Sequence, residues 1–250
     1  MKLGKPIATG NTAEIYLHDN MVVKVFKDYL PETESEYEAA KQKFAYACGL
    51  PVPKVLDVTK IDGKQAIIME YIKGRTLGDL LLETMEKAEH YIGLSIELQE
   101  RIHNIKADGL EPMTTKLRRQ IESARSLDQR HKSILLRKLN SFTVDNRLCH
   151  GDFHLFNLIL TDKNVTIIDW VDASAGDIRA DVCRSYLLYK QFSEELADLY
   201  IRMYCERSGV AREEILEWAP ILAGARLSEI VESEVEERLL DIVNRFCAPY

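Results

Sequence analysis

The first 72 residues alternate between short apolar runs and turn-forming residues, a pattern typical of antiparallel β-strands. Residues 14–17 and 22–26 predict two strands around a His18-Asp19-Asn20 turn, and two further strands are separated at Asp62-Gly63. Between Pro31 and Gly49 an acid-rich start, apolar residues at helical spacing and a terminal glycine predict one helix. This part of the chain is therefore expected to hold about four strands and one helix.

From residue 73 onward the apolar residues recur at intervals of three and four, which predicts helices. The helical pattern covers residues 77–105, 116–139 and 181–243, the last with breaks near Gly209 and Pro220. The exception is "LCHGDFHLFNLILTDKNVTIIDW", residues 148–170, whose two short apolar runs predict a hairpin. The pattern predicts an α+β protein with a small, β-rich N-lobe at 1–72 and a larger, mainly helical C-lobe at 73–250.

Composition and charge narrow the class of protein. Of the 250 residues 46% are hydrophobic, which is enough for a substantial core, and the net charge of -7 disfavours a general nucleic-acid binder. The five cysteines are scattered without a CxxC pair, so the sequence predicts neither a disulfide framework nor a zinc site, and a reducing cytoplasm is expected. No signal peptide or membrane span is expected, and the oligomeric state is left open.

Polar residues interrupt the 148–170 hairpin in a pattern that suits phosphoryl transfer. That reaction needs a group to orient or deprotonate the attacking hydroxyl, ligands for Mg²⁺, and a cation on the phosphates of ATP. Asp152, in the loop before the first strand of the hairpin, is the candidate base. Asn157 and Asp169 flank the hairpin and offer the oxygen ligands that Mg²⁺ prefers. Taken alone, an Asp and an Asn near a hairpin are most often turn and cap residues.

Lys24 is the candidate for the phosphate-binding cation. It lies in the middle of an apolar strand, where a buried lysine requires a charged partner, although a strand lysine can also extend to solvent. Glu38 on the following helix is the expected partner, with Glu34 and Glu36 as competitors. The loop around Gly10, ahead of the first hairpin, is the candidate cover for the triphosphate.

The motifs "HGDFHLFN" and "IIDW" together resemble the signatures of the aminoglycoside phosphotransferase and choline kinase family, small-molecule relatives of the protein kinases. The resemblance implies a bilobal, protein-kinase-like fold with a nucleotide-binding N-lobe and a C-lobe that carries the catalytic hairpin and the acceptor site. It also implies that the backbone of Glu70 and Ile72 contacts the adenine of ATP.

These observations predict an ATP- and Mg²⁺-dependent phosphotransferase that acts on a hydroxyl of a small, cationic, aminoglycoside- or choline-like molecule. The alternatives are a nucleotide-binding pseudokinase with a sensing or scaffolding role, and a metal hydrolase that uses His150, Asp152 and His154. A protein kinase is disfavoured because only residues 171–177 separate Asp169 from the next expected helix, which leaves no room for an activation segment.

The C-terminal region is strongly acidic. Between Glu194 and Asp241 there are 13 acidic residues, 5 arginines and no lysine. These charges are either the solvated faces of amphipathic helices or a site that attracts a cationic acceptor, for which Glu229, Glu232 and Glu236 have helical spacing. The sequence identifies neither the acceptor nor a preference for ATP over GTP.

Overall fold

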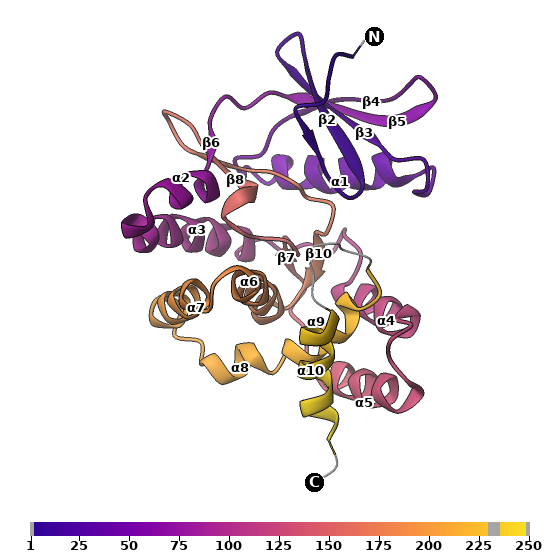
Figure 1. The fold of residues 1–250 in the computed structure, drawn as a ribbon, viewed down its shortest axis with the longest axis vertical. Helices are drawn as coiled ribbons and strands as arrows, with labels where there is room; N and C mark the ends of the chain where they lie inside the picture. The colour runs from indigo at the N-terminus through magenta and orange to yellow at the C-terminus, as the bar shows by residue number, and fades with distance from the viewer. Residues whose placement is uncertain (1–2, 230–235, 249–250) are drawn as a thin grey trace. The chain divides into compact units, whose positions relative to one another are not determined.

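The computed structural model describes residues 3–229 and 236–248, and its chain divides into two compact units (Figure 1). The first unit consists of Met1–Met85 and Leu155–Asp172, and the second of Glu86–His154 and Ala173–Tyr250. Both units are therefore discontinuous in sequence. The assignment of nucleotide binding to 1–72 and of catalysis to 73–250 concerns function and stays a prediction.

The first unit is built on a five-stranded antiparallel sheet (Figure 1). Its strands, in the order β1-β2-β3-β5-β4, are β1 (Ala8–Thr9), β2 (Ala13–His18), β3 (Met21–Phe26), β4 (Val55–Ile61) and β5 (Lys64–Glu70). Both predicted hairpins are confirmed. Their turns use Asp19-Asn20 and Asp62-Gly63 with positive φ at all four positions, the conformation that two-residue hairpin turns require.

Helix α1 (Glu34–Ala47) packs on β4 and β5. Successive strand residues point to opposite faces, so the buried side chains form two clusters. Phe26 packs with Ala39 of α1 in one cluster, whereas Val23 and Val25 belong to the other. Lys24 has the same parity as Phe26, and the alternation therefore directs it to the face of the sheet that α1 covers.

A second, three-stranded sheet completes the first unit. It has the order β6-β8-β9 and consists of β6 (Arg75–Thr76), β8 (Leu158–Leu160) and β9 (Val165–Ile167). Strands β8 and β9 are the predicted hairpin. Helix α2 (Leu77–Glu83) packs on the 3₁₀ turn η2 (Leu155–Asn157), where a Cβ on Gly78 would lie 2.5 Å from the Phe156 ring. This close approach requires glycine.

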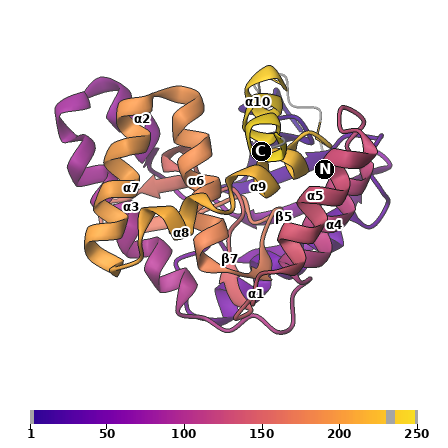
Figure 2. The same ribbon diagram turned by 90° about the horizontal axis from the view of Figure 1, so that it is seen from below.

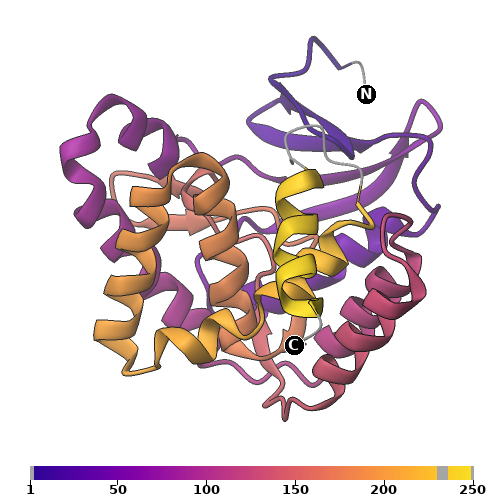
Figure 3. The same cartoon turned by 60° about the horizontal axis from the view of Figure 1, so that its bottom comes forward.

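The second unit is mostly helical (Figure 2). Its helices are α3 (Ala88–His103), α4 (Met113–Ser123), α5 (Gln129–Asn140), α6 (Ile178–Phe192), α7 (Glu194–Ser208), α8 (Arg212–Leu216), α9 (Ala219–Arg226) and α10 (Glu236–Cys247), and the short turn η1 (Met85–Lys87) precedes α3. Strands β7 (Arg147–Cys149) and β10 (Ser174–Gly176) pair antiparallel. Helices α3, α6, α7 and α8 form one packed group, and α4, α5, α9 and α10 form another (Figure 3).

The predicted helices are present, but each predicted helical stretch is divided into two or more separate helices. Four of the described helices begin at residues whose side chains accept a hydrogen bond from the first turn, which satisfies a backbone N–H and fixes the start of the helix. These N-caps are Thr76, Asp128, Asp177 and Ser193. Both expected breaks are present. Gly209 ends α7 in the left-handed conformation, and α8 ends at Leu216 before α9 begins at Ala219 with Pro220 in its first turn. None of the described helices combines the length and apolar character of a membrane span.

Candidate active site

Lys24 and Glu38 form a buried ion pair in the first unit. The Lys24 Nζ donates to Glu38 Oε1 at 2.6 Å, and the side chains are only 9% and 1% exposed. Strand β3 supplies the lysine and α1 the glutamate, so the pair connects the sheet to the helix that covers it. Neither competitor is buried, since Glu34 is half-buried and Glu36 exposed.

Asp169 is the second carboxylate on Lys24. Its Oδ1 lies 3.2 Å from Nζ, and its side chain is 39% exposed, far more than that of Glu38. The residue follows β9 and has φ +63°, a left-handed conformation that aspartate tolerates better than most residues. Its carboxylate is therefore fixed at one end by Lys24 while one side remains open to solvent.

The charges of these three residues are coupled. Burial lowers the pKa of Lys24, but the carboxylates of Asp169 and Glu38 more than offset this and raise it above its ordinary value. Burial raises the pKa of Glu38, and the charge of Lys24 only partly opposes that shift. Lys24 is therefore a permanent cation at neutral pH.

Lys41, one turn beyond Glu38 on α1, holds the segment after Asp169. It is buried, its Nζ donates to the carbonyl of Val171 at 2.5 Å, and it lies 4.0 Å from the centroid of the Tyr37 ring. One helix thus contacts both Lys24 and the backbone beyond Asp169. The sequence analysis did not identify Lys41, although its spacing of three from Glu38 puts both residues on the same helix face.

Asn157 lies at the same end of the β8–β9 hairpin as Asp169. Its carbonyl accepts a hydrogen bond from the Ile168 N–H at 3.0 Å, directly before Asp169, and Asn157 is buried. Two oxygen-bearing side chains suited to Mg²⁺ thus flank one hairpin.

Asp152 lies in the second unit, in the loop after β7. Gly151 has φ +83°, which glycine adopts without strain, and its N–H donates to Asp181 Oδ1 at 2.7 Å. The Asp152 carboxylate is 3.4 Å from His154 and 3.6 Å from Arg184 of α6, and the Asp152 N–H donates to His150 Nδ1 at 3.3 Å. His150 thus hydrogen-bonds the backbone of this loop.

Asp152 remains ionised in this environment. Burial disfavours the carboxylate, but the hydrogen bond from His154 and the positive charge of Arg184 help to outweigh burial and hold its pKa well below the usual range. Such a carboxylate is a weak base but a constant hydrogen-bond acceptor. The contact of Arg184 with Asp152 was not predicted from the sequence, although Arg184 lies one helical turn after Asp181.

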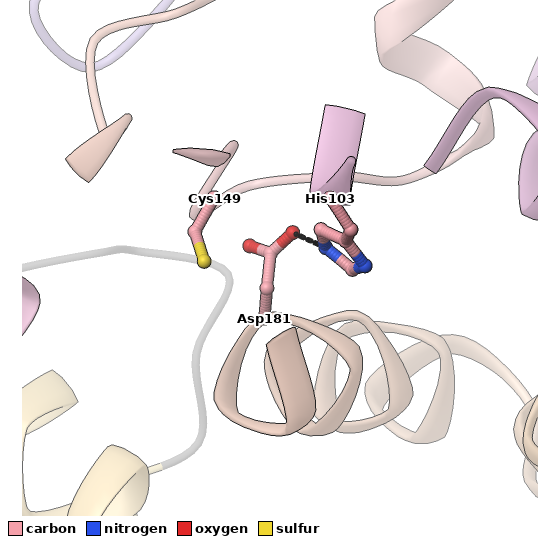
Figure 4. Close-up of side chains that lie close together, drawn as sticks. All are labelled: His103, Cys149 and Asp181. Atoms are coloured by element: carbon pink, nitrogen blue, oxygen red, sulfur yellow. Dashed lines mark hydrogen bonds and ion pairs between the residues drawn. The ribbon is translucent and has the colours of Figure 1, made fainter. Parts of the chain in front are cut away.

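Asp181 braces this loop from the interior of α6, whereas the N-cap of α6 is Asp177. Its Oδ2 lies 2.9 Å from His103 Nε2, while its other oxygen accepts from Gly151. Figure 4 shows the carboxylate between the His103 ring and the Cys149 sulfur. In the described part of the chain these are the one set of three His, Cys, Asp or Glu side chains close enough together to hold a metal ion, but both oxygens of the Asp181 carboxylate already accept hydrogen bonds. Nothing in the sequence pointed to His103.

Gly10, Glu70 and Ile72 lie in the first unit, and none of them contacts Lys24, Glu38 or Asp169 through a hydrogen bond. The Gly10 N–H donates to the carbonyl of Ala13, which closes a tight loop before β2. At the end of β5, the Glu70 N–H donates to the carbonyl of Lys54. Within the described residues the Ile72 N–H makes no hydrogen bond.

Glu229 and Glu236, two of the three acidic residues with helical spacing near the C-terminus, are engaged within the second unit. Glu229 pairs with Arg226 and accepts from Gln120, and Glu236 accepts from the Ser126 hydroxyl. Glu232 lies outside the described residues.

Comparison with known proteins identifies the family. The model of the phosphotransferase enzyme family matches residues 4–218, most of the chain. This chain belongs to the phosphotransferase enzyme family. The resemblance seen in "HGDFHLFN" and "IIDW" is confirmed, and the family identification applies to the residues of both units described above.

Solved structures confirm the protein-kinase-like α+β fold of this family. The aminoglycoside phosphotransferase APH(4)-Ia, in complex with ADP and hygromycin B, superposes with a TM-score of 0.72 at 13% identity over 98% of this chain and 93% of that one. Choline kinase LicA from Streptococcus pneumoniae gives 0.66 at 14% identity over 100% and 94%. Acyl-CoA dehydrogenase family member 11 of Homo sapiens is 24% identical over 173 residues, which are 59% of this chain but only 22% of that protein.

Proposed function

We propose that this protein transfers the γ-phosphoryl group of ATP, with Mg²⁺, to a hydroxyl of a small cationic molecule. The observation that carries the proposal is Lys24, held by Glu38 at 2.6 Å and Asp169 at 3.2 Å within a chain of the phosphotransferase family. Phosphoryl transfer depends mainly on positioning and on stabilisation of negative charge, and a permanently charged, immobilised lysine supplies both.

Lys24 would bind the non-transferring phosphates. A buried lysine that is fixed by Glu38 loses little conformational entropy when an anion arrives, so its charge is already positioned for binding. Gly10 would approach the phosphates from its loop, since it lacks a side chain that could obstruct them. The Ile72 N–H and the Glu70 carbonyl would contact the adenine.

Asp169 and Asn157 fit a Mg²⁺ site. Both offer hard oxygen ligands from one hairpin, and the half-exposed Asp169 carboxylate has room for a second cation beside Lys24. Mg²⁺ would supply charge neutralisation on the phosphate oxygens. Asp169 and Asn157 would hold the ion, and Lys41 would keep the backbone after Asp169 in place.

Asp152 would orient the acceptor hydroxyl. Its low pKa keeps it ionised, so it accepts a hydrogen bond from the hydroxyl and takes the proton late, as a loose transition state allows. His154 and Arg184 fix the direction of the carboxylate. The cationic acceptor class is supported by the acidic balance of the chain and by its likeness to a choline kinase. We place the protein in the cytoplasm, where a reducing environment maintains its free cysteines.

The decisive experiment measures ADP release from Mg²⁺–ATP with aminoglycosides, choline, ethanolamine, amino alcohols and neutral sugars as acceptors. One cationic acceptor is expected to stimulate turnover, and Asp152→Asn should reduce kcat by about 10²- to 10⁴-fold with nearly unchanged ATP affinity. Asp162→Asn, in the exposed turn of the hairpin, is the matched control. Tight ATP binding with no turnover on any acceptor would instead identify a pseudokinase, and wild-type turnover in Asp152→Asn would refute the role of Asp152.

A further inference from the structure

The second unit contains a cavity that the proposed reaction does not use. It has a volume of about 520 Å³, in the range of small-molecule sites, and it lies among α3, the start of α6, α7 and α8. These helices pack against one another (Figures 1 and 2). Tyr204, Ile178 and Val210 give it an apolar wall. Asp152, His154 and Arg184 are not among its lining residues.

The charges around the cavity favour a cation. Four of the lining residues are acidic and two are basic: Glu100, Asp145, Asp177, Glu214, Arg147 and Arg179. Both arginines are neutralised within the wall, since Arg147 donates to Asp145 at 2.6 Å and Arg179 to Asp177 at 2.6 Å. Glu100 pairs with Arg207. Within the described residues Glu214 makes no salt bridge, and its Oε2 accepts a hydrogen bond from the Ala211 N–H at 3.4 Å. The other carboxylate oxygen of Glu214 thus remains for a ligand.

One buried ring nitrogen of His103, at the wall of the cavity, also lacks a hydrogen-bond partner in the described residues. His103 lines the cavity, is only 6% exposed, and its Nδ1 has no hydrogen-bond partner in the described part of the chain. Because Nε2 faces Asp181, Nδ1 lies on the far edge of the ring (Figure 4). Buried polar atoms are normally hydrogen-bonded, and leaving one without a partner costs stability. A ligand in the cavity would relieve this cost.

We propose that this cavity is a second binding site, for a small organic amine whose ammonium group pairs with Glu214 and donates to His103 Nδ1. The apolar part of the amine packs on Tyr204, Ile178 and Val210. A donor on Nδ1 fixes the ring tautomer in which Nε2–H donates to Asp181.

The site is linked to the catalytic loop through two hydrogen bonds. His103 contacts Asp181 at 2.9 Å, and Asp181 accepts from the Gly151 N–H at 2.7 Å, one residue before Asp152. An amine that stabilises the His103–Asp181 pair therefore also stabilises the Gly151 conformation. Because coupling between two sites is reciprocal, a change that stabilises this conformation of Gly151 also raises the affinity for the amine, by the same factor.

Binding is tested by calorimetry without ATP or acceptor, so the result does not depend on phosphotransferase activity. The probes are tyramine, putrescine and agmatine, with 4-ethylphenol as the uncharged counterpart of tyramine and citrate as an anion. At least one amine should bind, and Glu214→Lys should weaken it about three- to tenfold, as expected for loss and reversal of a partly exposed ion pair. Glu213→Lys, the adjacent exposed carboxylate outside the cavity, should leave the affinity within about twofold.

A second variant and a second readout address the location and the coupling. Ser208→Tyr, at the exposed rim of the cavity, should block the amine without altering the fold. Hydrogen exchange of the peptide that contains Gly151 should slow when the amine binds, and this effect should be lost in Glu214→Lys. Absence of amine binding, equal affinities in Glu214→Lys and Glu213→Lys, or preferential binding of citrate or 4-ethylphenol would each overturn the proposal.

Discussion

Lys24 has two carboxylate partners in very different environments. Glu38 is 1% exposed and Asp169 is 39% exposed, so Glu38 has no access to water and depends on Lys24 for charge compensation. Glu38 Oε2 has no hydrogen-bond partner in the described residues, which makes this dependence stronger. Glu38 therefore serves to hold Lys24, while Asp169 is the carboxylate that can turn to another cation.

Substitution of Lys24 tests whether Glu38 depends on it for charge compensation. Lys24→Met is expected to lower the free energy of unfolding by about 3–5 kcal/mol, because it leaves Glu38 as a buried carboxylate without a cation. Adding Glu38→Gln should recover part of the loss, which urea unfolding of the two single variants and the double variant measures as a coupling energy. Lys60→Met, on the exposed side of β4, is the control. Additive losses in the cycle would show that the two residues do not act as a unit.

Part of this residue-level arrangement could be predicted from the sequence, and part could not. Asp152, Asn157 and Asp169 lie in the recognisable motifs "HGDFHLFN" and "IIDW". A lysine in an apolar strand, such as Lys24, predicts a charged partner. Arg184 contacts the loop around Asp152 directly, and His103 contacts it through Asp181, both from helices distant in sequence. From the sequence alone, such an arginine or histidine on a helix cannot be told from a surface residue. Their roles depend on tertiary contacts that no local spacing encodes.

Helix α1 connects the five-stranded sheet to the segment after Asp169. Glu38 and Lys41 lie one turn apart on this helix, and they contact Lys24 and the Val171 carbonyl respectively. A rotation or shift of α1 would therefore move both groups together. The helix acts as one rigid support for residues from distant parts of the first unit.

Lys41→Met should loosen this support while it keeps most of the apolar stem. The Val171 carbonyl would lose a charged donor, at a cost of about 1–3 kcal/mol, and the backbone of residues 168–172 should exchange amide hydrogens faster. Hydrogen exchange with peptide resolution measures the change. Lys43→Met, exposed on the same helix, is the matched control, and equal exchange in the two variants would contradict the role given to Lys41.

The sequence predicted the strands of the three local hairpins better than the remaining short strands. The hairpins β2–β3, β4–β5 and β8–β9 have clear alternation and turn residues, and all are present. Strands β1, β6, β7 and β10 have two or three residues each, and the last three pair with partners far along the chain. Such strands carry no periodicity of their own, because their partners alone define them.

The Asp181 carboxylate makes the free energy of unfolding of the whole protein depend on pH. Burial raises its pKa, but the hydrogen bonds from His103 and from the Gly151 N–H outweigh burial, so its pKa is lower in the folded protein than usual. A lowered folded pKa stabilises the protein above the unfolded pKa, about 3.9, and this contribution is lost as the pH falls through the folded value.

Asp181→Asn should therefore destabilise the protein by about 1–3 kcal/mol at pH 7, and its deficit should shrink below about pH 4. Urea unfolding between pH 7 and pH 3 measures the difference from wild type. Asp198→Asn, in an exposed pair with Arg212, should cost less than about 1 kcal/mol at every pH. A deficit for Asp181→Asn that stays constant down to pH 3 would show that its charge is not responsible.

The discontinuity of the two units also has a consequence for the order of events during synthesis. The chain leaves the first unit after Met85 and returns to it only for Leu155–Asp172. Glu38 follows Lys24 by 14 residues, but Asp169 follows it by 145. At the usual elongation rate of about 5–20 residues per second, Glu38 emerges from the ribosome within seconds of Lys24, and Asp169 roughly 7–30 seconds after it. A nascent chain can therefore pair Lys24 with its structural partner first, and the lysine acquires its exposed partner only after most of the protein has been made.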